Sequence, residues 1–329
     1  MQIILKNGLT IGDGSPVFII AEVGSNFITK ADCIKSIHQA AIAGASAVKF
    51  QLYTHQELYG FPGEVKGVLD PTWLPDLKAE ADKRNVLFMC TAFSPEGYEV
   101  INPWVMIHKI ASSEACHLRI LQKVRQLGKP VILSTGAKGY EDIKGAIKVL
   151  EDTPTVLMYC VVAYPARRID VAVCRALKNV FNTLVGYSDH STDILILPRA
   201  ATFAGACVIE KHFTIIPEVS TPDQPHSLDP SEFKLMVDNL RNTLPIKIGP
   251  IPEEKTALLK YNRRIMAIKD LNPGDELIEG VNIGIFRSLK DDTRAAHPFT
   301  IDNFIGKRMK VSLKCGEGIW IDDIERSEQ

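Results

Sequence analysis

Six residues of this sequence carry an ammonium or a hydroxyl group and come at or just after short apolar runs. Such donors suit a phosphate or a carboxylate, and two lysines from separate elements can neutralise a dianion that one group would not hold. The sequence therefore predicts an anion-binding site. Its candidate residues are Lys49, Thr91, Lys109, Ser112, Ser134 and Ser188.

Carboxylates and imidazoles occur near the same positions along the chain. Glu22, Glu114, Glu210 and Asp223 could exchange protons with a substrate or orient other groups. His190 and His212 follow two consecutive apolar runs, so their imidazoles could share one divalent metal ion. Together with the anion site, these residues predict one catalytic pocket.

Each of these residues also has a simpler interpretation. A single lysine at the end of a strand is often a surface residue with a buried stem, and His212 beside Phe213 could be a core histidine. The adjacent Glu210 and Lys211 could form a structural ion pair inside the fold. We favour a shared site because all the candidates occupy the same end of successive elements.

Eight short apolar runs must position these side chains, and segments with helical periodicity separate them. Strand–helix alternation repeated eight times over roughly 240 residues predicts an α/β fold, the (β/α)8 TIM barrel, whose active sites lie at the carboxyl ends of the strands. The predicted strands are 17–21, 45–48, 86–89, 105–107, 131–133, 155–158, 183–186 and 206–209, and the predicted helices are 31–43, 71–84, 95–102, 118–127, 140–150, 171–179, 193–204 and 231–240.

A doubly wound open sheet is the competing fold. It would carry a GxGxxG turn after the first strand, and residues 21–26 read AEVGSN instead. The barrel is therefore the better prediction.

The pattern changes after residue 245. Pro245, Pro250 and Pro252 predict a linker at 246–261 between a barrel domain at 1–245 and a second domain at 262–329. Short β-like runs surround turns at Pro273-Gly274 and Gly316, which indicates a small β-rich domain. The predicted strands there are 264–268, 276–278, 283–286, 310–312 and 318–321.

The bulk composition excludes several classes of partner. The 329 residues are 46% hydrophobic and 23% charged, with a net charge of −1, so no overall charge attracts nucleic acid or an anionic membrane. No apolar run approaches the roughly 20 residues that span a bilayer, and residues 1–13 do not resemble a signal peptide. The seven cysteines show no CxxC spacing. We expect a cytoplasmic protein with reduced thiols.

Seven short motifs, in order, resemble those of the sialic acid (N-acetylneuraminate) synthase family, which includes legionaminic and pseudaminic acid synthases. The resemblance runs from about residue 15 to the C-terminus, and the tail is similar to the SAF (antifreeze-like) domain of these enzymes. The motifs are IIAEVGSN at 19–26, AGASAVKFQ at 43–51, KIASSE at 109–114, LSTG at 133–136, YP at 164–165, GYSDHS at 186–191 and EKHFT at 210–214.

The resemblance implies an aldol-type condensation of phosphoenolpyruvate with N-acetylmannosamine or a related amino sugar, which gives a nonulosonic acid and phosphate. The six anion-site residues would then bind phosphoenolpyruvate, and the four carboxylates would surround the reacting carbons. His190 and His212 would hold Mn²⁺ or Mg²⁺. Gln51 and Tyr164 would contact the sugar, and Arg287 would reach it from the partner subunit of a domain-swapped homodimer.

Departures from the family pattern cluster among the residues expected to contact the sugar. Phe27 replaces a histidine, Val162 replaces an Asn or Ser, the segment after Gln51 is short, and Ser288-Leu289-Lys290-Asp291 replaces a Pro-Gly-x-Gly turn beside Arg287. Losing a polar contact changes substrate discrimination strongly. We therefore expect a different acceptor, such as a diamino-dideoxy hexose.

Two other classes of function remain open at this point. One is a different barrel aldolase or synthase, using phosphoenolpyruvate or a Schiff base on Lys49 or Lys109 with another aldose. The other is a non-catalytic, sugar-binding homologue that keeps the fold.

Overall fold

The computed structural model divides the chain into two compact units, Met1–Thr243 and Leu244–Gln329. It describes residues 1–65, 67–216, 223–242, 252–254, 258, 261–288 and 294–325. The division falls within two residues of the predicted end of the barrel domain. The predicted linker at 246–261 lies largely outside the described residues.

Eight parallel strands form a closed barrel in the first unit, which confirms the predicted α/β barrel. Each strand pairs with the next along the chain, and the last pairs with the first, where His212 lies opposite Glu22. Closure therefore brings the ends of the chain's first and last barrel strands together. The strands are β3 (Phe18–Gly24), β4 (Ala47–Leu52), β5 (Leu87–Ala92), β6 (His108–Ile110), β7 (Val131–Ser134), β8 (Thr155–Cys160), β9 (Leu184–Asp189) and β10 (Ala206–His212).

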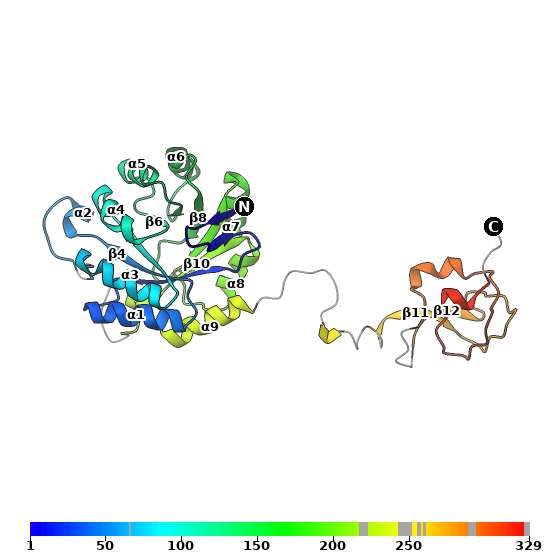
Figure 1. The fold of residues 1–329 in the computed structure, drawn as a ribbon. Coiled ribbons are helices and arrows are strands. Elements are labelled where there is room, and N and C mark those ends of the chain that lie inside the picture. Colours follow the sequence, from blue (N-terminus) through cyan, green and yellow to red (C-terminus); the bar gives the residue numbers. More distant parts are fainter. Residues whose placement is uncertain are drawn as a thin grey trace. The chain divides into compact units, whose positions relative to one another are not determined.

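Helices surround these strands (Figure 1). Their starts follow local signals: Thr29 and Asp32 form a capping box at α1, and Asp229 with Glu232 forms another at α9, where Pro230 takes the first position. The helices are α1 (Lys30–Ile42), α2 (His55–Tyr59), α3 (Leu74–Lys83), α4 (Pro95–Ile101), α5 (Leu118–Leu127), α6 (Tyr140–Leu150), α7 (Ala172–Phe181), α8 (Ile196–Phe203) and α9 (Pro230–Arg241).

The strands continue through the polar residues that were predicted to follow them. Lys49, for example, lies in the middle of β4 and Ser188 near the end of β9. The prediction of a strand at 105–107 was wrong, because the strand is β6 at His108–Ile110. Polar side chains such as Lys49 and Lys109 are tolerated inside strands because they point into the barrel and find charged partners.

Alternation along each strand divides the interior into two layers. Successive side chains point to opposite faces, so Ile20 and Glu22 share the inward face of β3, while Ile19, Ala21 and Val23 pack outward against the helices. The inward residues are apolar in the amino-terminal half of the barrel and polar in the carboxyl half. The apolar layer includes Ile20, Ala47, Leu87, Met89, Ile107, Ile132, Val156, Met158, Leu184 and Val208.

A hairpin that the sequence did not reveal packs on this apolar layer. Strands β1 (Gln2–Ile4) and β2 (Thr10–Gly12) pair antiparallel. Their side chains Ile3 and Ile11, with Leu5, join the same hydrophobic cluster as the inward residues. The hairpin therefore covers the amino-terminal end of the barrel interior.

The second unit is a small β-rich body with its own core. Its strands β11 (Arg263–Ala267) and β12 (Ile283–Arg287) pair antiparallel. The strands predicted at 276–278, 310–312 and 318–321 were wrong, since pairing there is limited to isolated bridges such as Glu276 with Arg308 and Met266 with Gly318. Its core comprises Ile265, Ala267, Leu271, Leu277, Ile283, Ala296, Phe304, Met309, Ile319 and Ile324.

No helix among the described residues is both long and apolar enough to cross a membrane.

Candidate active site

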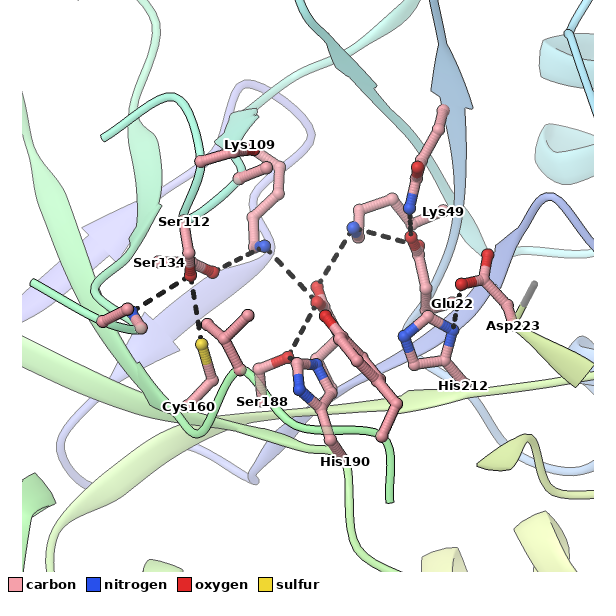
Figure 2. A pocket seen from close by; sticks show the side chains of 18 of the residues that line it. Glu22, Lys49, Lys109, Ser112, Ser134, Cys160, Ser188, His190, His212 and Asp223 are labelled. Carbon is pink, nitrogen blue, oxygen red and sulfur yellow. Dashed lines mark hydrogen bonds and ion pairs between the residues drawn. The ribbon is translucent and has the colours of Figure 1, made fainter. Parts of the chain in front are cut away.

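A cavity of about 470 Å³ opens among the carboxyl ends of the barrel strands. Most of the predicted site residues line it, although they come from positions 22 to 223 of the sequence. Figure 2 shows many of their side chains pointing toward one another. Those in the lining are Glu22, Lys49, Gln51, Lys109, Ser112, Ser134, Tyr164, Ser188, His190, Glu210, His212 and Asp223.

Two lysines and two glutamates form a buried chain of charges across the cavity. Lys49 Nζ lies 3.0 Å from Glu22 Oε2 and 3.5 Å from Glu210 Oε2. Lys109 Nζ lies 3.3 Å from Glu210 Oε1. All four side chains are inward residues of barrel strands: Glu22 on β3 lies between the neighbouring strands of Lys49 and Glu210, whereas Lys109 on β6 reaches Glu210 across the barrel.

The pKa values of the two glutamates move in opposite directions. Burial raises the pKa of Glu22 to about 7, and the charge of Glu210 adds to the rise against the pull of Lys49. Burial also opposes ionisation of Glu210, but Lys109 and Lys49 outweigh it and hold the pKa of Glu210 at about 2. Near neutral pH, Glu210 is therefore ionised, and Glu22 exchanges a proton readily.

The two lysines also differ. Burial works against the charge of Lys49, yet Glu210 and Glu22 raise its pKa above the ordinary value. Burial lowers the pKa of Lys109, and the charge of Glu210 is the largest influence that opposes this. Lys49 is therefore a fixed cation, whereas Lys109 is the lysine closer to losing its proton.

Hydroxyl groups surround this chain of charges. Lys109 Nζ donates to Ser134 Oγ at 2.8 Å, and Ser188 Oγ donates to Glu210 Oε1 at 3.1 Å. Ser112 Oγ accepts from the Gly136 amide at 3.0 Å. A side chain at Gly136 would strike Cys160 Sγ and Ser112 Oγ, so the glycine allows this close approach.

Two predicted residues do not line the cavity. Thr91 is buried beneath it, with its Oγ1 3.4 Å from Lys49 Nζ, so it contacts the lysine rather than the open space. Glu114 lies in a turn after β6, where its amide bonds back to Ala111. Its proposed catalytic role rests on the KIASSE motif and stays a prediction.

Three imidazoles gather at one side of the cavity. The ring centroids of His212 and His226 are 4.6 Å apart, and those of His190 and His212 are 5.6 Å apart. Ligand atoms of His212, Asp223 and His226 all lie within 4.8 Å of one another. His226 was not predicted, because it ends a short 3-10 helix (Gln224–His226) beyond the last strand and no apolar run precedes it.

These groups have the protonation states that a divalent metal requires. Burial lowers the pKa of His190 and of His226 to about 4, and it lowers that of His212 as well, so all three are neutral near pH 7. Burial opposes the charge on Asp223, but His212 and the hydrogen bonds from Ser25 lower its pKa overall. Neutral imidazoles beside a carboxylate are suitable donors for a divalent ion.

Asp223 is held by a turn of the backbone at the end of β3. Its Oδ2 accepts from the amide and the hydroxyl of Ser25, at 3.0 and 2.9 Å. Gly24 has a φ of +57°, and a side chain there would lie 2.3 Å from Asp223 Oδ2. A glycine is therefore needed for the carboxylate to reach this position.

The residues expected to contact a sugar differ in their surroundings. Tyr164 is 53% exposed and packs between His190 and His226, with ring centroids 4.4 and 4.7 Å away. Gln51 Nε2 donates to Glu22 Oε1 at 2.6 Å, so it orients that carboxyl. Val162 lines the cavity and is half exposed.

Two further predicted features lie away from the cavity lining. Phe27 is buried against Phe50 and Trp73, so it is a packing residue. Arg287 belongs to the second unit, where its guanidinium lies 5.6 Å from the ring centroid of Tyr261. Ser288 beside it is buried, and Leu289-Lys290-Asp291 lie outside the described residues.

Lys211 corrects one interpretation of the sequence. Glu210 and Lys211 are adjacent and do not pair, because they point to opposite faces of β10. Lys211 Nζ lies 2.8 Å from Asp189 Oδ2 on the outer face, whereas Glu210 faces the cavity. The structural ion pair exists, but it joins Lys211 to Asp189.

Comparison with known proteins identifies the family. The model of the NeuB family matches residues 64–247, more than half of the chain. The chain belongs to the NeuB family. A relative from Methanocaldococcus jannaschii, uncharacterized, is 36% identical over 284 residues, covering 81% of this chain and 84% of the relative.

Two named relatives of this NeuB-family chain are acid synthases. The N,N'-diacetyllegionaminic acid synthase of Campylobacter jejuni is 33% identical over 295 residues, covering 80% of this chain and 88% of the relative. The crystal structure of the N-acetylneuraminic acid synthetase of Leptospira borgpetersenii, in complex with citrate, superimposes with a TM-score of 0.71 at 32% identity, covering 78% of this chain and 95% of that one. The expected family is thereby confirmed.

Proposed function

We propose that this protein condenses phosphoenolpyruvate with an amino-sugar aldehyde and water to give a nonulosonic acid and phosphate. The observation that carries the proposal is the pair of buried lysines, Lys49 and Lys109, that face one cavity with two glutamates of opposite pKa shift. The acid synthases among the relatives support the same reaction class.

The anion would bind where the lysines and hydroxyls converge. With both glutamates ionised, Lys49 and Lys109 are matched one to one, which leaves no surplus charge for a phosphate. Protonation of Glu22, whose pKa is about 7, frees positive charge in the cavity. Binding of phosphoenolpyruvate should therefore take up a proton, and Ser112, Ser134 and Ser188 would donate to its oxygens.

The carbon–carbon bond forms between C3 of phosphoenolpyruvate and the aldehyde carbon, water adds at C2, and the phosphate leaves. Glu22 can hold the proton that the new alkoxide needs, because its carboxyl is protonated for part of the time near pH 7. The ionised Glu210 stabilises positive charge that develops at C2. Lys49 and Lys109 oppose the growing charge of the departing phosphate.

A divalent ion, Mn²⁺ or Mg²⁺, would be held by His190 and His212 beside Asp223. His190 Nδ1 lies 2.8 Å from the Val161 carbonyl oxygen, which holds its ring in place and directs Nε2 inward. When bound, such an ion supplies Lewis acidity that polarises the aldehyde oxygen.

The acceptor would be a hexose with amino substituents that packs against Tyr164. Val162 and Cys160 make this part of the lining less polar, so we propose a diamino-dideoxy hexose rather than N-acetylmannosamine. The second unit would be a SAF (antifreeze-like) domain that brings Arg287 to the sugar of the partner subunit in a domain-swapped homodimer.

The decisive experiment measures phosphate release from phosphoenolpyruvate. The purified chain is assayed with a panel of 2-acetamido hexoses and diamino-dideoxy hexoses, with and without Mn²⁺, beside the Lys49→Met variant. We expect release with at least one acceptor, loss of about a hundredfold or more in the variant, and a nonulosonic acid as product. No release with any acceptor, together with no binding of phosphoenolpyruvate, would contradict the proposal.

A Schiff-base aldolase is the second candidate, because burial lowers the pKa of Lys109. Borohydride treatment with pyruvate would then attach the keto acid to Lys109 and add its mass to that peptide. An unlabelled Lys109 in an active protein rules this candidate out.

A further inference from the structure

We propose that His226 is a direct ligand of the divalent ion in this cavity, and that the added imidazole makes the site prefer Co²⁺ or Zn²⁺ to Mg²⁺. This inference rests on the proposed function only in placing a metal ion there. It concerns a residue outside the motifs that identify the family.

His226 lies closer to His212 than His190 does, and it forms one group with His212 and Asp223. One ligand atom from each of His212, Asp223 and His226 lies within 4.8 Å of the other two, so a single ion could contact all three. The ring of His190 is 5.6 Å from that of His212 and 6.4 Å from that of His226. Two imidazoles and a carboxylate form a common set for divalent transition metals.

Two nitrogens in this set are buried without a hydrogen-bond partner in the described part of the chain. They are Nδ1 of His212 and Nε2 of His226, on side chains that are 7% and 6% exposed. Leaving a buried polar atom unpaired is unfavourable. A metal ion held by both residues would satisfy both nitrogens.

The segment that carries His226 is fastened to the barrel on both sides. Before it, Asp223 Oδ2 accepts from the amide and the hydroxyl of Ser25 at 3.0 and 2.9 Å, and directly after it Ser227 Oγ accepts from Asn26 Nδ2 at 2.8 Å. After it, the amide of Leu228 donates to the His212 carbonyl at 2.9 Å. His226 is therefore placed against His212 before any ligand arrives, which is the condition for a preformed metal site.

The donor types determine which ions this set prefers. Mg²⁺ favours oxygen ligands in near-octahedral geometry, whereas nitrogen donors favour the later transition metals. Adding His226 to an imidazole–carboxylate pair raises the share of nitrogen. We therefore expect Co²⁺ and Zn²⁺ to bind more tightly than Mn²⁺, and Mn²⁺ more tightly than Mg²⁺.

The test measures metal binding without turnover. Tag-free protein is stripped with chelator, and the affinities for Co²⁺ and Mg²⁺ are measured by calorimetry, with the visible absorption of bound Co²⁺ as a report of its ligands. We expect His226→Ala to weaken Co²⁺ binding by at least about tenfold, to alter the Co²⁺ spectrum, and to reduce the preference over Mg²⁺. His226→Asp, which restores a ligand oxygen, should recover part of the affinity with less preference for Co²⁺.

Controls separate this inference from a folding defect and from the proposed function. His38→Ala removes an imidazole from α1 and should leave Co²⁺ binding unchanged, and urea unfolding of each variant checks the fold. Co²⁺ affinity and spectrum that stay the same in a folded His226→Ala protein would overturn the inference, whatever the phosphate assay shows. Metal binding that depends on His226 in a protein that never releases phosphate would instead refute the proposed function alone.

Discussion

Two buried clusters of charge lie on opposite faces of β10. The adjacent residues Glu210 and Lys211 belong to the inner and the outer cluster, respectively. On the outer face, Lys211 Nζ contacts Asp189 Oδ2 at 2.8 Å and the carbonyl oxygens of Ser191 and Asp193 at 2.6 and 3.1 Å. On the inner face, Glu210 meets Lys49 and Lys109 at 3.5 and 3.3 Å.

The two clusters differ in how completely their polar atoms are satisfied. The outer ammonium has three acceptors, and Asp189 also accepts from Tyr187 and from the Ser191 amide. In the inner cluster, Oε2 of Glu22 and Oε2 of Glu210 share the Lys49 ammonium, at 3.0 and 3.5 Å, and have no other hydrogen-bond partner among the described residues. A saturated cluster stabilises the fold, whereas an unsaturated one beside a cavity is suited to bind a ligand.

The largest expected effect comes from breaking the outer cluster. Lys211→Met leaves the Asp189 carboxylate buried without its cation, so the free energy of unfolding should fall by about 3–5 kcal/mol. Urea denaturation measures this loss. Activity per folded molecule should change little, because Lys211 does not line the cavity; a stable but inactive variant would contradict this division between the faces.

Breaking the inner cluster should instead lower activity strongly and stability only a little. Lys109→Met is expected to lower kcat/KM for phosphoenolpyruvate by about a hundredfold, or about 3 kcal/mol, while stability falls by much less than in Lys211→Met. Steady-state assays and urea denaturation are compared on the same preparation. Lys123→Met on the surface of α5 serves as the control. Unchanged kinetics in Lys109→Met would remove that lysine from the proposed anion site.

The pH dependence of stability tests the inner cluster through the raised pKa of Glu22. Because the folded pKa of Glu22 is about 7, above its ordinary value of 4.5, the folded state binds more protons than the unfolded state between these pH values. The stabilising contribution of Glu22 is therefore fully present below pH 4.5 and is lost as the pH rises through 7. Glu22→Gln should gain stability relative to the unaltered protein over this window, by at most about 3 kcal/mol. Metal-free protein is measured, and a difference that stays flat from pH 5 to 8 would refute the raised pKa.

The smallest expected effect concerns the support of the outer cluster. Tyr187→Phe removes the hydroxyl that donates to Asp189 Oδ1 at 2.9 Å, and we expect a loss of about 1–2 kcal/mol of stability. Thermal unfolding would report it. Phosphate release should be unaffected in the same variant, and a large loss of activity would show that the two faces are coupled through Ser188.

The barrel was predictable from the sequence because parallel strands buried on both faces are apolar runs. The wrong strand at 105–107 and the missed hairpin both follow from relying on apolar runs to find strands. His108 and Lys109 are polar, so the strand was assigned to the apolar residues before them, although both side chains find partners inside the fold. The hairpin at the start of the chain has strands of three residues each, too short for alternation to show.

The site was predictable where its residues lie in strands, and less so where they lie in loops. Lys49, Lys109, Ser134 and Ser188 follow from strand position, because equivalent ends of parallel strands meet at one rim. Glu114 and His226 sit in turns, whose direction no periodicity reveals. Glu114 does not line the cavity in this structure, and His226 was missed although it is buried beside His212.

The hairpin of β1 and β2 affects how ligands enter the barrel and in which order they bind. Because Ile3, Leu5 and Ile11 cover the amino-terminal end of the interior, the described residues leave the buried lysines open to ligands at the opposite rim. In the proposed reaction, phosphoenolpyruvate sits deeper than the sugar, so it must bind first. The phosphate that it leaves behind must be released last. We therefore expect ordered kinetics, with the sugar unable to occupy its place productively until phosphoenolpyruvate lies beneath it.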